Sequence, residues 1–172
     1  MQKLIKFITF EEFKILHSKA KDKYTKLAII LGFGSGLRIS EVIGFKDIIP
    51  PLMPDNINLE AHQIKILGKG GKERITVCSP ALKEDHLKLL PIKIPRRTLQ
   101  HRIQKLSEKH LGKKISFHTL RHGFGNYMVN EKNLPLPMVQ GMMGHSRIDT
   151  TGIYTKANPK QAIEKAWDSF NN

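Results

Sequence analysis

The chain has 172 residues, of which 40% are hydrophobic and 26% charged, enough for one domain with a real core but too few for two comfortable ones. Its 29 Lys and Arg against 15 Asp and Glu give a formal net charge of +14, which favours nucleic acid first and an anionic membrane surface second as partner. A single cysteine excludes an internal disulfide, no Cys/His spacing predicts a metal site, and no run is long and apolar enough to span a membrane. We therefore expect a cytoplasmic protein that associates with DNA.

The positive charge is concentrated in the middle of the chain. Between Lys65 and Arg121 there are fifteen Lys and Arg residues against four acidic ones, so this segment carries +11 of the net charge. An unspecialised surface usually mixes both signs. The excess predicts a surface that follows nucleic-acid phosphates, with a plain solvated basic face as the alternative.

Helices are expected first. Thr9 and Glu12 have the spacing of a capping box and predict a helix to about residue 20. A second helix should begin near Lys23 and weaken in the glycines of 32–36. A short third helix should follow, with Arg38 where its exposed N–H groups favour an anion. Residues 49–54 hold three prolines and predict a loop.

A β-hairpin is expected next, because 62–67 and 73–78 alternate between apolar and polar residues. The glycine-rich loop 68–72 could approach a phosphate closely, and we expect Lys72 and Arg74 to contact DNA. A flexible solvated turn is the alternative.

More helices should complete the chain. Ser79-Pro80 predicts a helix start, and Pro95 predicts a long helix that closes near Gly112. One face of this long helix is basic and is expected to contact DNA through Arg96, Arg97, Arg102 and Lys105.

Three further helices are expected, from His118 to about 128, from Pro137 to Gly144, and from Asn158-Pro159 onward. The last is amphipathic and carries Trp167 and Phe170, which pack on the same fold or on a neighbouring subunit. The fold is therefore expected to be mainly α with a small antiparallel β-hairpin or sheet, an α+β arrangement.

Tyr154 is the candidate nucleophile. A tyrosine hydroxyl titrates near ~10, so it attacks only when neighbours help to remove its proton and stabilise the charge that develops. The candidates for this help are basic side chains and histidines. Arginine guanidiniums match phosphate oxygens in pairs, so the electrophile that suits them is a phosphodiester. The candidates are Arg38, Lys69, His118, Arg121 and His145.

Five motifs resemble the boxes of the tyrosine recombinases, also called the phage integrase family. They occur in that family's order and at its approximate spacing, with nine residues from His145 to Tyr154. The resemblance covers essentially the whole chain as a catalytic domain. The motifs are GLRISE at 36–41, GKGGKER at 68–74, HTLRH at 118–122, GHS at 144–146 and TTGIY at 150–154.

The resemblance implies that Arg38 and Arg121 hold the scissile phosphate and stabilise its pentacoordinate transition state. It implies that His145 donates a hydrogen bond to this phosphate and that Glu41 supports the arrangement from beneath. We expect Arg38, Arg121 and His145 to converge on one anion.

The resemblance also implies the proton transfers. Tyr154 would form a 3′-phosphotyrosine link, Lys69 would protonate the departing 5′ oxygen, and His118 would assist proton transfer at the nucleophile. Neither ATP nor a metal nor another cofactor would be needed, since the link retains the bond energy. Four protomers would act on double-stranded DNA through a Holliday junction, and we expect them to associate through the C-terminal helix.

Residues 1–172 are expected to form a single catalytic domain without the family's N-terminal core-binding domain, as an excised domain or a naturally short enzyme. Gly152 loosens the segment before Tyr154, so the tyrosine could act in a neighbour's site. Two other functions stay open: relaxation of supercoils, as in type IB topoisomerases, and a non-catalytic DNA-binding regulatory module.

Overall fold

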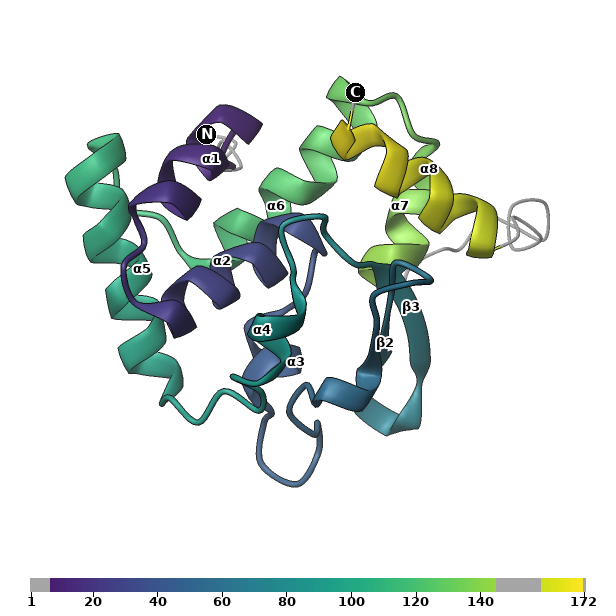
Figure 1. Ribbon diagram of the computed structural model, residues 1–172, viewed down its shortest axis with the longest axis horizontal. Coiled ribbons are helices and arrows are strands. Elements are labelled where there is room, and N and C mark those ends of the chain that lie inside the picture. Colours follow the sequence, from purple (N-terminus) through teal and green to yellow (C-terminus); the bar gives the residue numbers. More distant parts are fainter. Residues whose placement is uncertain (1–6, 145–158, 172) are drawn as a thin grey trace, which may run out of the picture.

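The computed structural model describes residues 7–144 and 159–171 (Figure 1). The first half of the chain supplies α1 (Phe10–Lys19), α2 (Lys23–Gly34), α3 (Ile39–Ile43), the 3₁₀ turn η1 (Pro54–Asn56), β1 (Ile57–Asn58), β2 (Gln63–Leu67), the 3₁₀ turn η2 (Lys69–Gly71) and β3 (Glu73–Val77). The second half supplies α4 (Glu84–Leu87), α5 (Arg96–Leu111), α6 (Phe117–Asn126), the π-helical turn η3 (Tyr127–Glu131), α7 (Leu136–Met143) and α8 (Pro159–Asn171). The prediction of a mainly helical fold with a small antiparallel sheet is confirmed.

The helical layer is built around α2. Every residue of α2 from Leu27 to Gly34 is buried, because α6, α1 and α5 all pack against this helix (Figure 1). The capping box predicted from Thr9 and Glu12 opens α1, and Gly112 closes α5 in the left-handed conformation. None of the helices in the described residues is long and apolar enough to cross a membrane.

The sheet has the strand order β1-β2-β3, antiparallel throughout. Ile64 and Ile66 of β2 are buried and pair with Thr76 and Arg74 of β3. Both α7 and α8 pack against β3, so the sheet has helices from the last third of the chain beside it (Figure 1). The predicted hairpin is confirmed, whereas the short strand β1 was not expected.

The predicted start of a helix at Ser79-Pro80 is wrong. Ser79 is buried beside the end of α2: its backbone N–H donates to Ser35 Oγ at 3.4 Å, and its own Oγ accepts from the backbone of Ala81 at 3.3 Å. Ser79, predicted as a helix cap, therefore lies in a turn that fixes the end of β3 to the end of α2. The helix α4 begins only at Glu84.

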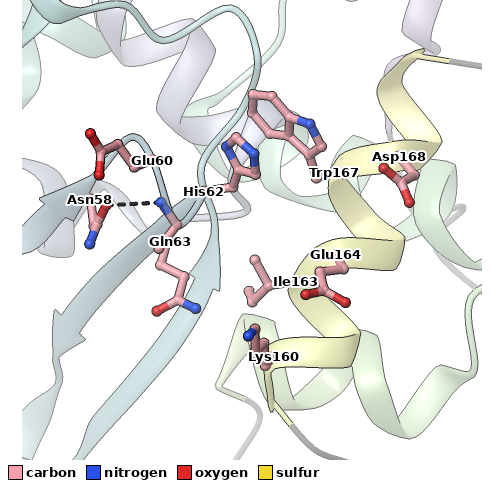
Figure 2. Close-up of a pocket in the computed structure, with 10 residues that line it drawn as sticks. Asn58, Glu60, His62, Gln63, Lys160, Ile163, Glu164, Trp167 and Asp168 are labelled. Carbon is pink, nitrogen blue, oxygen red and sulfur yellow. Dashed lines mark hydrogen bonds between the residues drawn. The ribbon is translucent and has the colours of Figure 1, made fainter.

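The C-terminal helix α8 packs on its own chain. Trp167 stacks on His62 with ring centroids 3.5 Å apart and planes 6° from parallel (Figure 2). Phe170 lies against Phe10 and Tyr127, and the Tyr127 hydroxyl donates to the Ser169 carbonyl at 3.2 Å. The sequence left two placements for this helix, on the same fold or on a neighbouring subunit. In this structure it packs on the same fold.

Candidate active site

Three arginines from three elements converge on the C-terminal end of α7. Arg74 Nε donates to the Met142 carbonyl at 2.8 Å, Arg121 Nη2 to the Met143 carbonyl at 2.7 Å, and Arg38 Nη2 to the Gly144 carbonyl at 3.0 Å. The last carbonyls of a helix lack partners within it and carry the negative end of its dipole. Consecutive carbonyls therefore gather guanidinium groups that lie far apart in the sequence.

Glu41 lies beneath this cluster with a side chain only 2% exposed. Its Oε1 accepts from Arg38 Nη1 at 3.0 Å and from Arg74 Nη1 at 2.6 Å. Its Oε2 accepts from Arg74 Nη2 at 2.9 Å and from the backbone N–H of Arg38 at 2.7 Å. The carboxylate therefore sets the position of Arg38 at the start of α3 through both its side chain and its main chain.

The cluster keeps an excess of positive charge, since three guanidiniums face one carboxylate. Burial alone would raise the pKa of Glu41, but the hydrogen bonds and charge of Arg74, together with Arg38, outweigh it and lower that pKa. Burial and the neighbouring Arg38 lower the pKa of Arg121 to about 9, so Arg121 is still a cation at neutral pH. The site is thus ready for an anion before any ligand arrives.

Arg38 and Arg121 differ in exposure. Arg121 is 2% exposed and its Nη1 donates to the Gly36 carbonyl, so its guanidinium is fixed between the turn after α2 and the end of α7. The Arg38 side chain is 42% exposed, so it can exchange the Gly144 carbonyl for an oxygen from solution. The structure brings the two arginines together at the end of α7, where they donate to the adjacent carbonyls of Gly144 and Met143.

His118 lies in the first turn of α6, which Ser116 caps. Its ring meets that of His122 edge-on, with centroids 4.1 Å apart. Burial, then the positive charges of Arg121 and Arg38, lower the pKa of His118. The imidazole is therefore neutral at pH 7 and can accept a proton beside the arginine cluster.

Other residues expected at the site lie at its edge or outside the description. Lys69 is exposed in the turn η2 between β2 and β3. His145 and Tyr154 lie outside the described residues, although the peptide bond after Gly144 leads directly from the cluster to His145.

The expected DNA contacts separate into two groups. Lys72, Arg96, Arg97, Arg102 and Lys105 are exposed, and Arg102 also pairs with Asp22 at 3.1 Å. Arg74 differs from the expectation: its side chain is only 13% exposed and all its nitrogens are engaged with Glu41 and Met142.

A register argument would have found the inward direction of Arg74. A five-residue loop at 68–72 pairs Leu67 with Glu73, and the next pair is then Ile66 with Arg74. Directly paired side chains lie on the same face of a sheet. Since Ile66 is buried, Arg74 had to point inward and needed an acid to meet it.

The pocket between α8 and the start of β2 is not suited to a phosphate. It has a volume of about 670 Å³ and lies between α8 and the start of β2 (Figure 2). Among the described residues that line it are three acids, Glu60, Glu164 and Asp168, and one lysine, Lys160, so the charge of this described lining repels DNA. Among residues 7–144 and 159–171, no group of three or more His, Cys, Asp or Glu could hold a metal ion.

The comparison with known sequences identifies the family. The model of the phage integrase family matches residues 6–161. A tyrosine recombinase XerC of Thermodesulfovibrio yellowstonii is 30% identical over 94% of this chain and 61% of its own length. A tyrosine recombinase XerA of Pyrococcus horikoshii is 33% identical over 95% of this chain and 62% of its own. The chain thus spans about three-fifths of the length of these relatives.

Solved structures share the fold. The integrase of mycobacterium phage Brujita has a TM-score of 0.65 at 19% identity, covering 96% of this chain and 59% of its own. The XerH site-specific recombinase bound to its difH substrate, a pre-cleavage complex, has a TM-score of 0.64 at 24% identity, covering 96% of this chain and 54% of its own. With the family match over residues 6–161, these findings confirm the resemblance seen in the motifs, and the chain belongs to the phage integrase family of tyrosine recombinases.

Proposed function

We propose that this chain is the catalytic domain of a site-specific DNA recombinase of the integrase or resolvase type. The observation that carries the proposal is the convergence of Arg38 and Arg121 over Glu41 at the end of α7, directly before His145. Two guanidiniums in one preorganised site can meet the charge of a phosphorane without reorganising during the reaction. The family membership adds the polynucleotide as the source of that phosphate.

The reaction would proceed by transfer of a phosphoryl group from DNA to protein and back. The Tyr154 oxygen attacks the phosphorus, its proton passes toward His118, and the bond to the 5′ oxygen breaks. Lys69 gives that leaving oxygen its proton, which completes the balance. A 5′ hydroxyl of another strand then attacks the 3′-phosphotyrosine and releases Tyr154.

The 3′-phosphotyrosine link would retain the energy of the broken phosphodiester bond, so ATP is not required. Arg38, Arg121 and His145 stabilise the negative charge on the oxygens of the phosphorane, so the proposal assigns no step to a metal or other cofactor. The partner is double-stranded DNA, and the protein would act in the compartment that holds that DNA.

Trapping a covalent adduct tests the proposal. A duplex nicked just 3′ of the cleavage site loses the short fragment that carries the new 5′ hydroxyl, so the adduct accumulates on a denaturing gel, with EDTA present throughout. We expect an adduct with the wild-type chain and none with Tyr154→Phe. An adduct that persists in Tyr154→Phe would show that another residue is the nucleophile.

A sulfur leaving group tests Lys69. A 5′-bridging phosphorothiolate leaves without needing a proton, so Lys69→Ala should slow cleavage strongly on ordinary DNA and little on the sulfur substrate. Equal losses on both substrates would contradict the role of general acid.

Two product assays separate the remaining functions. Recombinant products from paired target sites support a recombinase, whereas relaxation of a supercoiled plasmid without exchange supports the topoisomerase alternative. Tight DNA binding without any adduct would support a non-catalytic module.

We also propose that four protomers assemble on DNA through α8 around Trp167 and Phe170. In the described structure both side chains contact their own chain, so exchange of the helix between protomers would have to break the His62 stack and the Phe10 contact. Sedimentation with and without a two-site DNA measures the assembly. A complex with only two protomers per paired site would contradict it.

A further inference from the structure

We infer that Arg74 is a positioning residue. It places the phosphate-binding Arg38 by holding the Glu41 carboxylate and the C-terminal end of α7, both of which Arg38 contacts. The inference rests on the proposed function. It concerns a strand residue that does not itself meet the substrate phosphate.

Each of the three guanidinium nitrogens of Arg74 already donates a hydrogen bond within the cluster. Nη1 and Nη2 donate to the two oxygens of Glu41 at 2.6 and 2.9 Å, and Nε donates to the Met142 carbonyl at 2.8 Å. The side chain is 13% exposed, against 42% for Arg38. A paired fork of this kind fixes orientation as well as charge.

Arg74 contacts the two parts of the structure that Arg38 contacts, the Glu41 carboxylate and the C-terminal end of α7. Arg38 Nη1 shares Oε1 of Glu41 with Arg74, and Arg38 Nη2 donates to Gly144, two residues after the Met142 carbonyl that Arg74 holds. Strand β3, helix α3 and the end of α7 are thus joined at one point. If Arg74 were lost, the carboxylate and the helix end could each shift, and Arg38 would shift with them.

The charge balance leads to the same conclusion. Glu41 is buried and depends first on Arg74 and second on Arg38 to stay ionised. Without Arg74, the carboxylate would either take a proton or draw Arg38 inward as its only remaining ion-pair partner among the described residues. In either event Arg38 no longer presents its guanidinium to the substrate as before.

A direct contact with DNA is the competing role for Arg74, and the two roles differ in what they change. Loss of a phosphate contact weakens DNA binding and its salt dependence. Loss of a positioning residue slows the chemical step at saturating DNA while the Kd for DNA stays the same.

The experiment compares five chains and uses circular dichroism to verify that each is folded. They are the wild type, Arg74→Met, Arg74→Lys, Glu41→Gln and the double variant Arg74→Met/Glu41→Gln. Single-turnover adduct formation on the nicked duplex gives the rate, and fluorescence anisotropy gives the Kd. Lys14→Met is the control, because it removes a cation from an exposed Lys–Glu pair on α1.

We expect Arg74→Met to slow adduct formation by about 100-fold with the Kd unchanged, as a displacement of about 1 Å would do. Arg74→Lys keeps a charge for Glu41 and should recover part of the rate, and it remains the test if Arg74→Met does not fold. The double variant should be far less impaired than the product of the two single losses, since both act through one ion pair. The rate of Arg74→Met should also begin to fall at a higher pH than the wild-type rate, because Glu41 protonates more easily without Arg74.

Three results would overturn the inference alone: an Arg74→Met chain as fast as wild type, a loss confined to the Kd, or losses that multiply in the double variant. A wild-type chain that forms no adduct would overturn the proposed function instead, and this inference with it. The two failures are therefore distinguishable on the same gel.

Discussion

At the scale of single residues, position rather than residue type decides what each basic side chain does. Arg38, Arg74 and Arg121 carry the same group, but Arg121 is fixed between Gly36 and Met143, Arg74 is committed to Glu41, and Arg38 reaches solvent. His118 lies near these arginines, and its imidazole is neutral at pH 7 and can accept a proton.

The pH dependence of cleavage tests His118. Burial and the charges of Arg121 and Arg38 lower the pKa of His118 below its ordinary value of about 6.5, so it stays neutral from pH 8 to that value and protonates only below it. Adduct formation should therefore hold across neutral pH and decline only in acid. His118→Gln should lower the rate by about 100-fold and remove that acid decline. A decline at or above the ordinary histidine value would contradict the assignment.

At the scale of elements, the end of α7 is the structural centre of the site. Gly144 closes this helix with φ of +67°, and a Cβ on it would lie 2.7 Å from Arg74 Cδ and 2.9 Å from Arg74 Nε. Only glycine fits both the backbone conformation and the space.

Gly144→Ala and Gly112→Ala form a matched pair. Gly112 ends α5 with the same φ of +67°, but a Cβ added there would have nothing within 4 Å, so its alanine variant should lose only about 1 kcal/mol of unfolding free energy through the backbone. Gly144→Ala should lose more and should also slow adduct formation, because it displaces Arg74. Urea unfolding and the adduct assay measure both, and equal losses in the two variants would contradict the contact.

The attachment of α8 gives the second prediction at this scale. Trp167 is half-buried on His62, so Trp167→Ala should lower the unfolding free energy by about 2 kcal/mol, less than for a fully buried tryptophan. Amide hydrogen exchange in α8 should rise together with this loss. Lys165→Ala is the control on an exposed face of the same helix. Unchanged exchange in the Trp167 variant would show that the stack does not hold α8.

At the scale of the whole molecule, the net charge of +14 is not spread evenly over the chain. Four of the expected DNA contacts are exposed on α5, whereas the described lining of the pocket beside α8 has three acids, Glu60, Glu164 and Asp168, and one lysine. Electrostatic attraction should therefore orient DNA toward one side of the molecule.

Salt dependence measures that orientation. If Arg96 and Arg97 each neutralise one phosphate, replacing both with Gln should reduce the slope of log K against log salt by about 0.9 for each contact. Lys19→Gln, an exposed cation on α1, should leave the slope unchanged. A slope that is the same in all three proteins would remove α5 from the DNA surface.

The sequence alone determined the features that depend on neighbours a few residues apart. The capping box of α1, the glycine ends of α5 and α7, the hairpin and the position of Arg38 at the start of α3 all follow from such local patterns. The motifs were enough to bring Arg38, Glu41 and Arg121 into one predicted site. Local free-energy differences of this kind are fixed by residue type and spacing.

Only the tertiary structure decided the inward direction of Arg74, the turn at Ser79 in place of a helix start, and the placement of α8. Each depends on a partner far away in the sequence: Arg74 on Glu41 and Met142, Ser79 on Ser35, and Trp167 on His62. A buried polar group must find its partner wherever the fold supplies one, because leaving it unpaired costs more than the local preference it overrides. That requirement is what turned an arginine expected on the DNA surface into the support of the arginine cluster.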